Sequence, residues 1–464
     1  METSLNKATE EFKLILSNLE QALYQKALDW ARNVYQAILK YLDDQIRERR
    51  EKTFKIIRQD DTWYTTFLGL VKIKRRYYRS QDGSYHYLLD ELLGLSKHRH
   101  ITGAVQRLAL ELAGSMDFRQ SAETLRKTTS IDLSHQTVHR LVARVADPYL
   151  KKRDEAVKWF QMTGELPQSE NRSTGRILVE ADGVMLSLQR EKARKAEVKL
   201  GISYEGWRQV GKDRYGTANK LTYGDLVDSD TFWAAMTLKL HEKYDLSRIQ
   251  HMVLGGDGAG WIKDGATYFG AHYQLCRYHL NRELCRVLGH DRKTLRAMQQ
   301  AYNQGNVDAM FGILDAAIDS TAGETQKAIK KLVRYLKENV SGLKVYLPAD
   351  GQWRRTGAIE GNVDKLIVRR MKNQGMSWSL KGIRRMLWLR LTLYEGKLNE
   401  YLSNQDASLP PHKLPAKRVC QVMSKRLKQD YSSYFGAGLP ALIGPHASRP
   451  WAKMLKSITE VSMA

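Results

Sequence analysis

Three acidic residues in the middle of the sequence have the types and setting of metal ligands. Asp182 and Asp257 lie within or directly after apolar stretches that predict strands, and Glu360 lies near the start of a predicted helix. Three carboxylates brought to one sheet edge can hold two divalent cations about 3.5 to 4 Å apart for in-line phosphoryl transfer. Mg²⁺ accepts carboxylates together with water and phosphate oxygens. The sequence therefore predicts a site for two Mg²⁺ or Mn²⁺ ions at Asp182, Asp257 and Glu360.

Both aspartates are followed by glycine, which leaves a second interpretation open. An Asp-Gly step is a strong signal for a hairpin turn, so either position taken alone favours a turn residue. Ligands in open α/β sheets, in contrast, bind at the carboxyl ends of the strands. Other acids compete for the same role: Glu180 shares a strand face with Asp182, and Asp364 shares a helix face with Glu360. The remaining competitors are Asp225, Asp228, Asp230 and Asp264.

A second group of candidate ligands lies in the stretch CRYHLNRELCRVLGH, which contains Cys276, His279, Cys285 and His290. No Gly or Pro interrupts residues 276–288. On a continuous helix Cys285 would lie roughly 180° from Cys276, so a tetrahedral zinc site with all four ligands is disfavoured. Cys276 and His279 can face the same way, either as a buried cysteine beside a hydrogen-bonded histidine or as part of a functional site.

The elements that must position these residues begin at residue 176. Apolar segments separated by polar turns predict an antiparallel meander over residues 176–226, followed by a helix, the strand before Asp257, a further helix and a strand. This order is typical of an α/β layered domain with a mixed sheet. Residues from about 285 to 345 are helical and basic, which indicates a helical insertion, and residues 357–395 predict one or two further helices.

The N-terminal part of the chain combines a long helix with a basic hairpin. Residues 10–58 contain no Gly or Pro and space apolar residues three and four apart, which predicts one long amphipathic helix or two in succession. This helix could pack on its own domain or pair with a second chain. Residues 62–79 predict a β-hairpin whose second strand could follow a phosphate backbone or form a solvated face. The basic residues of that strand are Lys72, Lys74, Arg75, Arg76 and Arg79.

Three helices are predicted between residues 101 and 147, with Asp117 and Ser134 as N-caps of the second and third. The third helix is expected to stop before Pro148. Two short helices joined by a short turn match a helix-turn-helix, and three-helix units also have roles other than DNA binding. The residues expected on the polar face of the second of these helices, within reach of base edges, are Ser134, His135, Gln136, His139 and Arg140.

The overall charge favours a polyanionic partner. The 464 residues include 75 Lys and Arg against 51 Asp and Glu, a formal net charge of +24 with a pI near 9.7. Phosphates neutralised by such a protein release counterions, which makes nucleic acid the first hypothesis, ahead of a membrane surface or a ribosome. Three cysteines, the lack of an uninterrupted apolar stretch of membrane-spanning length and the lack of a secretory signal predict a cytoplasmic protein with no membrane partner.

Together these motifs resemble the bacterial insertion-sequence transposases of the DDE type, most closely the ISLre-two family, which is related to the Mutator-like transposases. In such families a strand Asp-Gly, a second Asp after a later strand, a Cys-x-x-His and a Glu after a helical insertion follow in this order. By position the resemblance, which covers most of the chain, assigns Asp182, Asp257, Cys276 with His279, and Glu360. Relatives often carry Thr-Asn-x-x-Glu before the last acid, whereas this chain has Thr-Gly-Ala-Ile-Glu.

The resemblance implies a ribonuclease H-like domain in which the three carboxylates hold the metal ions while Cys276 and His279 line the catalytic pocket. It further implies a transposase that binds the terminal inverted repeats of its own element, cleaves them with Mg²⁺ and joins the freed ends to target DNA. Concerted cutting of two ends requires a homodimer or a larger complex on double-stranded DNA. The basic residues after Glu360 that would clamp this DNA are Arg369, Arg370 and Lys372.

Two other functions stay open from the sequence: a sequence-specific DNA-binding protein with a vestigial nuclease domain, and a ribonuclease H-like, structure-selective nuclease. The expected fold class is a multidomain α+β protein with N-terminal helices, a β-hairpin, a helix-turn-helix and a ribonuclease H-like α/β catalytic domain with a helical insertion. The predicted segments are a helical segment at 1–58, a DNA-binding region at 59–150, a linker at 151–175, the catalytic domain at 176–400 and a basic tail at 401–464.

Overall fold

The computed structural model describes residues 2–95, 100–167, 172–344, 356–373 and 375–404, with side chains from residue 18 onward. Most of the predicted basic tail, residues 405–464, lies outside the described residues. The described residues form two compact units. The N-terminal unit contains residues up to 64 and 70–100, and the second unit contains residues 65–69 and 101 onward.

One long helix opens the N-terminal unit. α1 (Glu2–Arg49) is uninterrupted, which confirms the long helix, but it ends earlier than residue 58. Residues 55–58 instead open the strand β1 (Lys55–Thr66), which pairs with β2 (Gly69–Arg79). The helical periodicity was misleading here because Ile56 and Ile57 are β-branched and strand pairing overrides local propensity.

The predicted β-hairpin is confirmed as two strands of a three-stranded sheet. The sheet has the order β1–β2–β3, with β3 at Tyr85–His86, and the short helix α2 (Leu88–Leu92) follows it. Leu39 of α1, Ile73 of β2 and Leu89 of α2 are buried in one small core. The N-terminal unit is therefore held by contacts between the helix, the sheet and α2.

Three helices follow in the second unit, as predicted: α3 (Gly103–Ser115), α4 (Phe118–Thr128) and α5 (His135–Thr163). Asp117 accepts hydrogen bonds from the N–H groups at the start of α4, and Ser134 accepts one at the start of α5. Both predicted N-caps are confirmed.

The prediction that α5 stops before Pro148 is wrong, and so is the linker predicted from residue 151. The helix continues through Pro148 to Thr163. Proline removes one hydrogen bond from a helix interior, but contacts beyond it compensate. Val157 is buried, and the guanidinium group of Arg153 forms an ion pair with the buried carboxylate of Asp225.

The central sheet of the second unit has the order β10–β9–β4–β5–β8. Its strands are β4 (Arg176–Leu188), β5 (Lys195–Tyr204), β8 (Leu221–Asp225), β9 (His251–Gly256) and β10 (His272–Leu275). β4, β5 and β8 pair antiparallel, which confirms the meander, whereas β9 pairs in parallel with both β4 and β10. The sequence did not predict the hairpin of β6 (Gly206–Gly211) and β7 (Arg214–Ala218) between β5 and β8.

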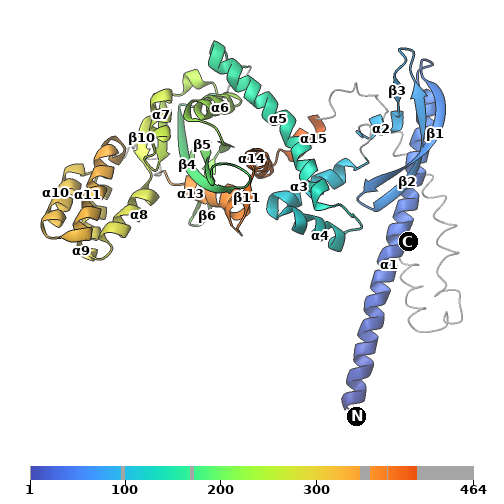
Figure 1. Cartoon of the computed structure of the whole chain (residues 1–464), viewed down its shortest axis with the longest axis horizontal. Coiled ribbons are helices and arrows are strands. Elements are labelled where there is room, and N and C mark those ends of the chain that lie inside the picture. Colours follow the sequence, from blue (N-terminus) through green and yellow to red (C-terminus); the bar gives the residue numbers. More distant parts are fainter. Residues whose placement is uncertain (1, 96–99, 168–171, 345–355, 374, 405–464) are drawn as a thin grey trace. The chain divides into compact units, whose positions relative to one another are not determined.

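Helices pack on both faces of this sheet (Figure 1). On one face, α6 (Ser229–His241) and α7 (Gly260–Phe269) share a core with Ile177 and Val179 of β4. On the other face, α3, α4, α5 and α14 (Leu380–Tyr394) share a core with Leu178 and Leu186 of β4. The two helices of the predicted helix-turn-helix, α4 and α5, thus contribute to the core of the second unit, and the predicted boundary at residue 150 does not separate two units.

The predicted helical insertion forms a layer with its own core. Its helices are α8 (Arg277–Leu288), α9 (Arg292–Asn303), α10 (Val307–Asp319), α11 (Gly323–Glu338) and α12 (Val340–Leu343). Buried residues such as Leu284, Leu314 and Leu332 pack together with Leu275 of β10. The insertion therefore starts directly after β10, somewhat earlier than residue 285.

The chain returns from the insertion to the sheet through short elements. These are α13 (Ile359–Val363), the π-helical stretch η2 (Asp364–Lys372), β11 (Ser377–Trp378), α14 and α15 (Leu398–Asn404). β11 pairs in parallel with the far end of β4. One 3-10 turn, η1 (Leu246–Arg248), precedes β9. Among the described residues, no helix is both long enough and apolar enough to span a membrane.

Candidate active site

Asp182 and Asp257 lie in register on neighbouring parallel strands. β4 runs without interruption through Asp182, so its interpretation as a turn residue is wrong. Glu180 of β4 lies opposite Gly255 of β9, which places Asp182 and Asp257 at equivalent positions two residues further on. The parallel register brings the two carboxylates to the same edge of the sheet, as the sequence predicts.

Asp257 combines a turn with a place in the site. Its Oδ1 atom accepts a hydrogen bond from the N–H of Ala259 at 2.9 Å, and Gly258 between them has φ +100°, which favours glycine. A Cβ atom at Gly258 would also come within 2.7 Å of the side chain of Asn339. Tyr335 of α11 donates a hydrogen bond to the main-chain oxygen of Asp257 at 2.8 Å. The insertion thus holds this turn in place.

Glu360 lies in the first turn of α13, and Glu180 holds that turn in place. The carboxylate of Glu180, 1% exposed, accepts hydrogen bonds of 3.0 to 3.1 Å from the N–H groups of residues 357–359. It also accepts one from the hydroxyl of Tyr204. N–H groups at a helix start lack partners within the helix and favour a negative charge. Glu180 is therefore a positioning residue for Glu360.

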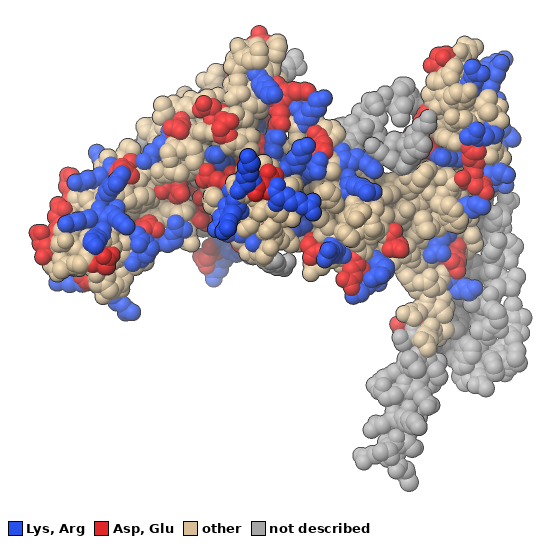
Figure 2. Space-filling model, viewed as in Figure 1, with Lys and Arg blue, Asp and Glu red and all other residues tan. Residues whose placement is uncertain are grey.

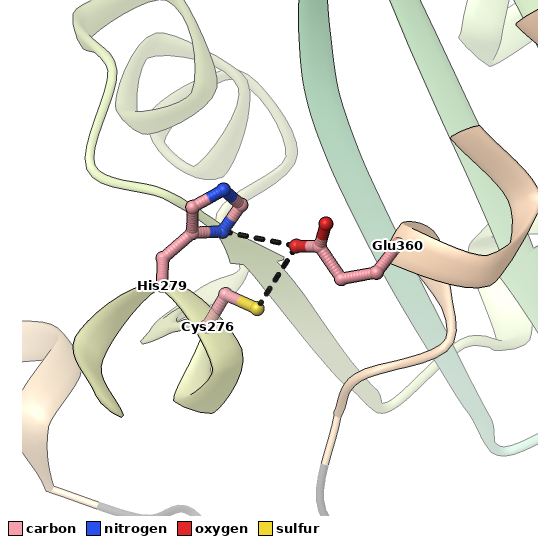
Figure 3. Close-up of side chains that lie close together, drawn as sticks. All are labelled: Cys276, His279 and Glu360. Carbon is pink, nitrogen blue, oxygen red and sulfur yellow. Dashed lines mark hydrogen bonds and ion pairs between the residues drawn. The ribbon is translucent and has the colours of Figure 1, made fainter. Parts of the chain in front are cut away.

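Cys276 and His279 lie beside Glu360, as Figure 3 shows. Cys276 is the N-cap position of α8, directly after β10, and His279 is in the first turn of α8. The Nδ1 atom of His279 lies 3.0 Å from Oε1 of Glu360, and the thiol of Cys276 donates to the same oxygen at 3.7 Å. Cys285 is exposed on α8 and belongs to neither of the metal-ligand groups of the described residues.

Burial and acidic neighbours together set the electrostatics of the site. Burial and the negative charges of Glu360 and Asp257 raise the pKa of Asp182 to about 6, against the opposing charge of His279. Burial lowers the pKa of His279, but its contacts with Cys276 and Glu360 outweigh burial and raise the pKa to about 10. At neutral pH His279 is therefore a cation between carboxylates.

Two overlapping groups of side chains have the spacing of metal ligands. The ligand atoms of Asp182, Asp257 and His279 lie within 4.8 Å of one another, and so do those of Cys276, His279 and Glu360. His279 belongs to both groups. The structure thus brings together all five residues that the sequence assigned to the catalytic pocket.

The competing acids have other roles. Asp364 forms an exposed ion pair with Arg369 at 2.7 Å, so it does not assist Glu360. Asp225 is buried between the guanidinium groups of Arg153 and Arg384. The other three lie on or next to helices: Asp228 is the N-cap of α6, Asp230 is in its first turn, and Asp264 is exposed on α7.

Burial separates the basic residues of β2 into two classes. Lys72, Lys74 and Arg79 are exposed, as a role in phosphate binding requires. The prediction for Arg75 and Arg76 needs correction, because both are buried in ion pairs, Arg75 with Asp90 and Arg76 with Asp43 and Asp44. These partners neutralise them within the N-terminal unit. Alternation along a strand does not reveal this, since the partners come from α1 and α2.

The polar face predicted for α5 is exposed. His135, Gln136, His139 and Arg140 are all solvent-accessible, whereas the hydroxyl of Ser134 is engaged as the N-cap. His139 contacts the ring of Phe118, and its pKa is lowered by burial and by the charges of Arg385 and Arg140. His139 is therefore a poorer cation than an isolated histidine.

The basic residues after Glu360 also differ from one another. Arg369 and Lys372 are largely exposed, whereas Arg370 is 3% exposed and donates from Nε to the main-chain oxygen of Ala113 at 2.9 Å. Figure 2 shows Lys and Arg side chains gathered over the region where Figure 1 labels α13, β11 and β6. Arg370 therefore does not belong to an exposed clamp.

Comparison with known proteins identifies the family. Residues 8–403 match the model of a family described as an uncharacterised protein family, UPF0236. The chain belongs to UPF0236. A UPF0236 protein of Caldanaerobacter subterraneus subsp. tengcongensis is 25% identical over 405 residues, which cover 85% of this chain and 82% of the relative.

Two further UPF0236 relatives bear on the genetic setting of the family. One from the same Caldanaerobacter strain, with the same identity and coverage, carries a name that joins eleven loci. One from Streptococcus gallolyticus, named for its position in the 3′ region of vanSb, is 26% identical over 362 residues and covers 76% of each chain. A single name for many loci is consistent with mobile elements.

Proposed function

We propose that this UPF0236 protein is a DDE transposase, which cleaves the ends of its own DNA element and joins them to target DNA. The observation that carries the proposal is the convergence of Asp182, Asp257 and Glu360. Two of these acids lie in register on parallel strands, and the third lies on a helix turn held by a buried carboxylate. An Asp182 whose pKa is raised by burial and by two acidic neighbours has the character of a residue at a functional site.

The residues fit divalent metal ions by the chemistry of their donors. Asp182 and Asp257 supply carboxylate oxygens in one ligand group and Glu360 in the other, and such oxygens suit Mg²⁺ or Mn²⁺ and leave positions for water and phosphate oxygens. Bound there, such ions would activate the attacking oxygen and stabilise the leaving one. Glu180 would hold the turn that carries Glu360, and Cys276 and His279 would contact the carboxylate of Glu360 from α8.

The fold and the family context support this proposal. A mixed sheet with three antiparallel and then two parallel strands, covered by helices on both faces, agrees with a ribonuclease H-like domain. The helix-turn-helix and the net charge of +24 supply the means to bind DNA ends. Relatives whose single name joins many loci have the distribution expected of the product of a mobile element.

Cleavage of DNA that carries the ends of the encoding element tests the proposal. We expect cuts at the element ends that require Mg²⁺ or Mn²⁺ and that are lost in Asp257→Asn. Asp264→Asn is the matched control, because it removes an exposed carboxylate of α7 outside both ligand groups. Specific binding without cleavage under any divalent metal would favour a DNA-binding protein with a vestigial nuclease domain. Cleavage of structured RNA or junctions without preference for the ends would favour a structure-selective nuclease.

A further inference from the structure

The second unit contains a groove that does not include Asp182, Asp257 or Glu360. A groove of about 1050 Å³ is bounded by the starts of α4 and α5 and by β11 with the start of α14. None of the five residues of the candidate active site lines it. Four of the residues predicted to reach base edges do line it: His135, Gln136, His139 and Arg140. The groove therefore needs its own explanation.

Three helix N-termini meet at this groove. The first residues of α4, α5 and α14 all lie along it, and each helix has eleven residues or more. The positive end of a helix dipole and the free N–H groups there favour anions. Asp117, Ser134 and Ser379 cap some of these N–H groups, and the other N–H groups at each helix start still lack a partner within their helix.

The charged side chains along the groove add to this positive potential. Five arginines line it, Arg119, Arg140, Arg190, Arg370 and Arg385, against two carboxylates. Asp117 caps α4 and favours the charge of Arg370, whereas Glu123 forms an ion pair with Lys127 and Arg385 forms one with Asp147. Arg140 and Arg190 are exposed at the groove, and no ion pair is found for either among the described residues.

Arg370 carries a buried hydrogen-bond donor at this groove. Its side chain is buried over the rings of Trp378 and Phe118, at 5.3 and 5.7 Å from guanidinium carbon to ring centre. Its Nη2 atom has no hydrogen-bond partner and its guanidinium group no ion pair within the described part of the chain. Burial lowers the pKa of Arg370 to about 10, so it is still charged at neutral pH. Asp117 at the start of α4 is an acidic neighbour that favours the charge of Arg370, but it forms no ion pair with Arg370 among the described residues, whereas the buried arginines of β2 do have ion-pair partners.

We propose that this groove binds the phosphate backbone of a DNA strand, with Arg140 and Arg190 at phosphates on the rim and Arg370 as the interior counter-charge. The choice of DNA as the polyanion rests on the proposed function. The strand would pass along the starts of α4 and α5, so that Gln136 and His139 meet its bases. The residues predicted to contact bases and the arginines that contact phosphates would then lie in one groove.

The test is the salt dependence of DNA binding by the full chain. Affinity for a labelled duplex from the element end is measured by fluorescence anisotropy at increasing salt, without divalent metal. In the double variant Arg140→Gln/Arg190→Gln we expect the slope of log affinity against log salt to fall by about one for each lost phosphate contact. The control Arg248→Gln/Lys327→Gln removes two exposed charges that are paired with Asp245 and Glu324, and it should bind like the native protein.

The variant Arg370→Met tests the contribution of the buried arginine to DNA binding separately from that of Arg140 and Arg190. It keeps an unbranched side chain under Trp378 and should weaken binding about tenfold, while thermal unfolding shows whether it is folded. If it does not fold, the rim variant still decides. An unchanged slope in the rim variant, with native binding intact, would overturn the groove and leave the transposase proposal standing. A native protein that binds no DNA would overturn both.

Discussion

Two buried aspartates on the same sheet show how differently a carboxylate can be used. Asp225 at the end of β8 is held by Arg153 and Arg384, which lower its pKa against the effect of burial. Asp182 on β4 has Glu360 and Asp257 as neighbours and a raised pKa. A buried acid that is paired with cations stabilises the fold. A buried acid with acidic neighbours lowers the stability of the fold, and its ionised form would be favoured by a bound cation.

The largest expected effect is on catalysis. Asp182→Asn should lower the rate of DNA cleavage by about 1000-fold or more, because a lost metal ligand removes several kcal/mol of transition-state stabilisation. Stability without metal should be unchanged or raised, since the substitution removes repulsion between acids. Cleavage assays and thermal unfolding of the same preparation measure both. Cleavage close to the native rate would mean that Asp182, like Asp225, has a structural role and no catalytic one.

In contrast to Asp182→Asn, Asp225→Asn should destabilise the protein, by about 3 to 5 kcal/mol, because it leaves two arginines beside a neutral side chain. Chemical denaturation measures this free energy of unfolding. The control is Asp154→Asn, which removes the 40% exposed second carboxylate beside Arg384 and should cost less than about 1 kcal/mol. Equal effects of the two substitutions would contradict the distinction by burial.

The pH dependence of stability should have opposite signs at the two sites. For Asp182 the folded pKa of about 6 exceeds the ordinary value of 3.8, so the free energy of unfolding falls as pH rises between these values. The loss amounts to at most about 3 kcal/mol, at about 1.4 kcal/mol for each pKa unit. For Asp225, with a lowered pKa, stability is lost as pH falls. Denaturation without divalent metal should show that Asp182→Asn removes the first effect and Asp225→Asn the second.

The smallest expected effects come from the residues that hold Glu360. Glu180→Gln should reduce cleavage about 10- to 100-fold and raise the Mg²⁺ concentration for half-maximal rate, because an amide cannot match the carboxylate at three N–H groups. Tyr204→Phe removes one hydrogen bond to Glu180, worth about 0.5 to 1.5 kcal/mol, and should be milder. Glu197→Gln on β5 is the control. A Glu180→Gln variant with normal Mg²⁺ dependence would mean that the cap does not position Glu360.

The sequence indicated the candidate site residues by their type and setting, but not the contacts that position them. Apolar runs before Asp182 and Asp257 indicate strands, whereas the parallel register that brings both acids to one edge is known from the structure. The role of Glu180 was missed, because its partners lie 177 to 179 residues away in a loop whose return path no local pattern reveals. The resemblance to DDE transposases placed Glu360 despite the Thr-Gly-Ala-Ile that precedes it.

Errors occurred where tertiary contacts override local signals. Pro148 normally ends a helix, but ion pairs of α5 with β8 and α14 hold the helix together beyond it. Arg75 and Arg76 continue a basic strand pattern, but carboxylates from α1 and α2 neutralise them. Charge counts along a strand say nothing about such partners, since burial and pairing depend on elements distant in sequence.

The shared core of the helix-turn-helix and α14 has a consequence for synthesis on the ribosome. Arg390 of α14 donates a hydrogen bond to the main-chain oxygen of Gly114 at the end of α3, 276 residues earlier. α3, α4 and α5 emerge first but cannot complete their core until α14 has left the exit tunnel. A nascent chain that ends before α14 would thus lack part of the core that these three helices share with it. Folding of the first helices of the second unit would therefore finish only when that unit is nearly fully translated.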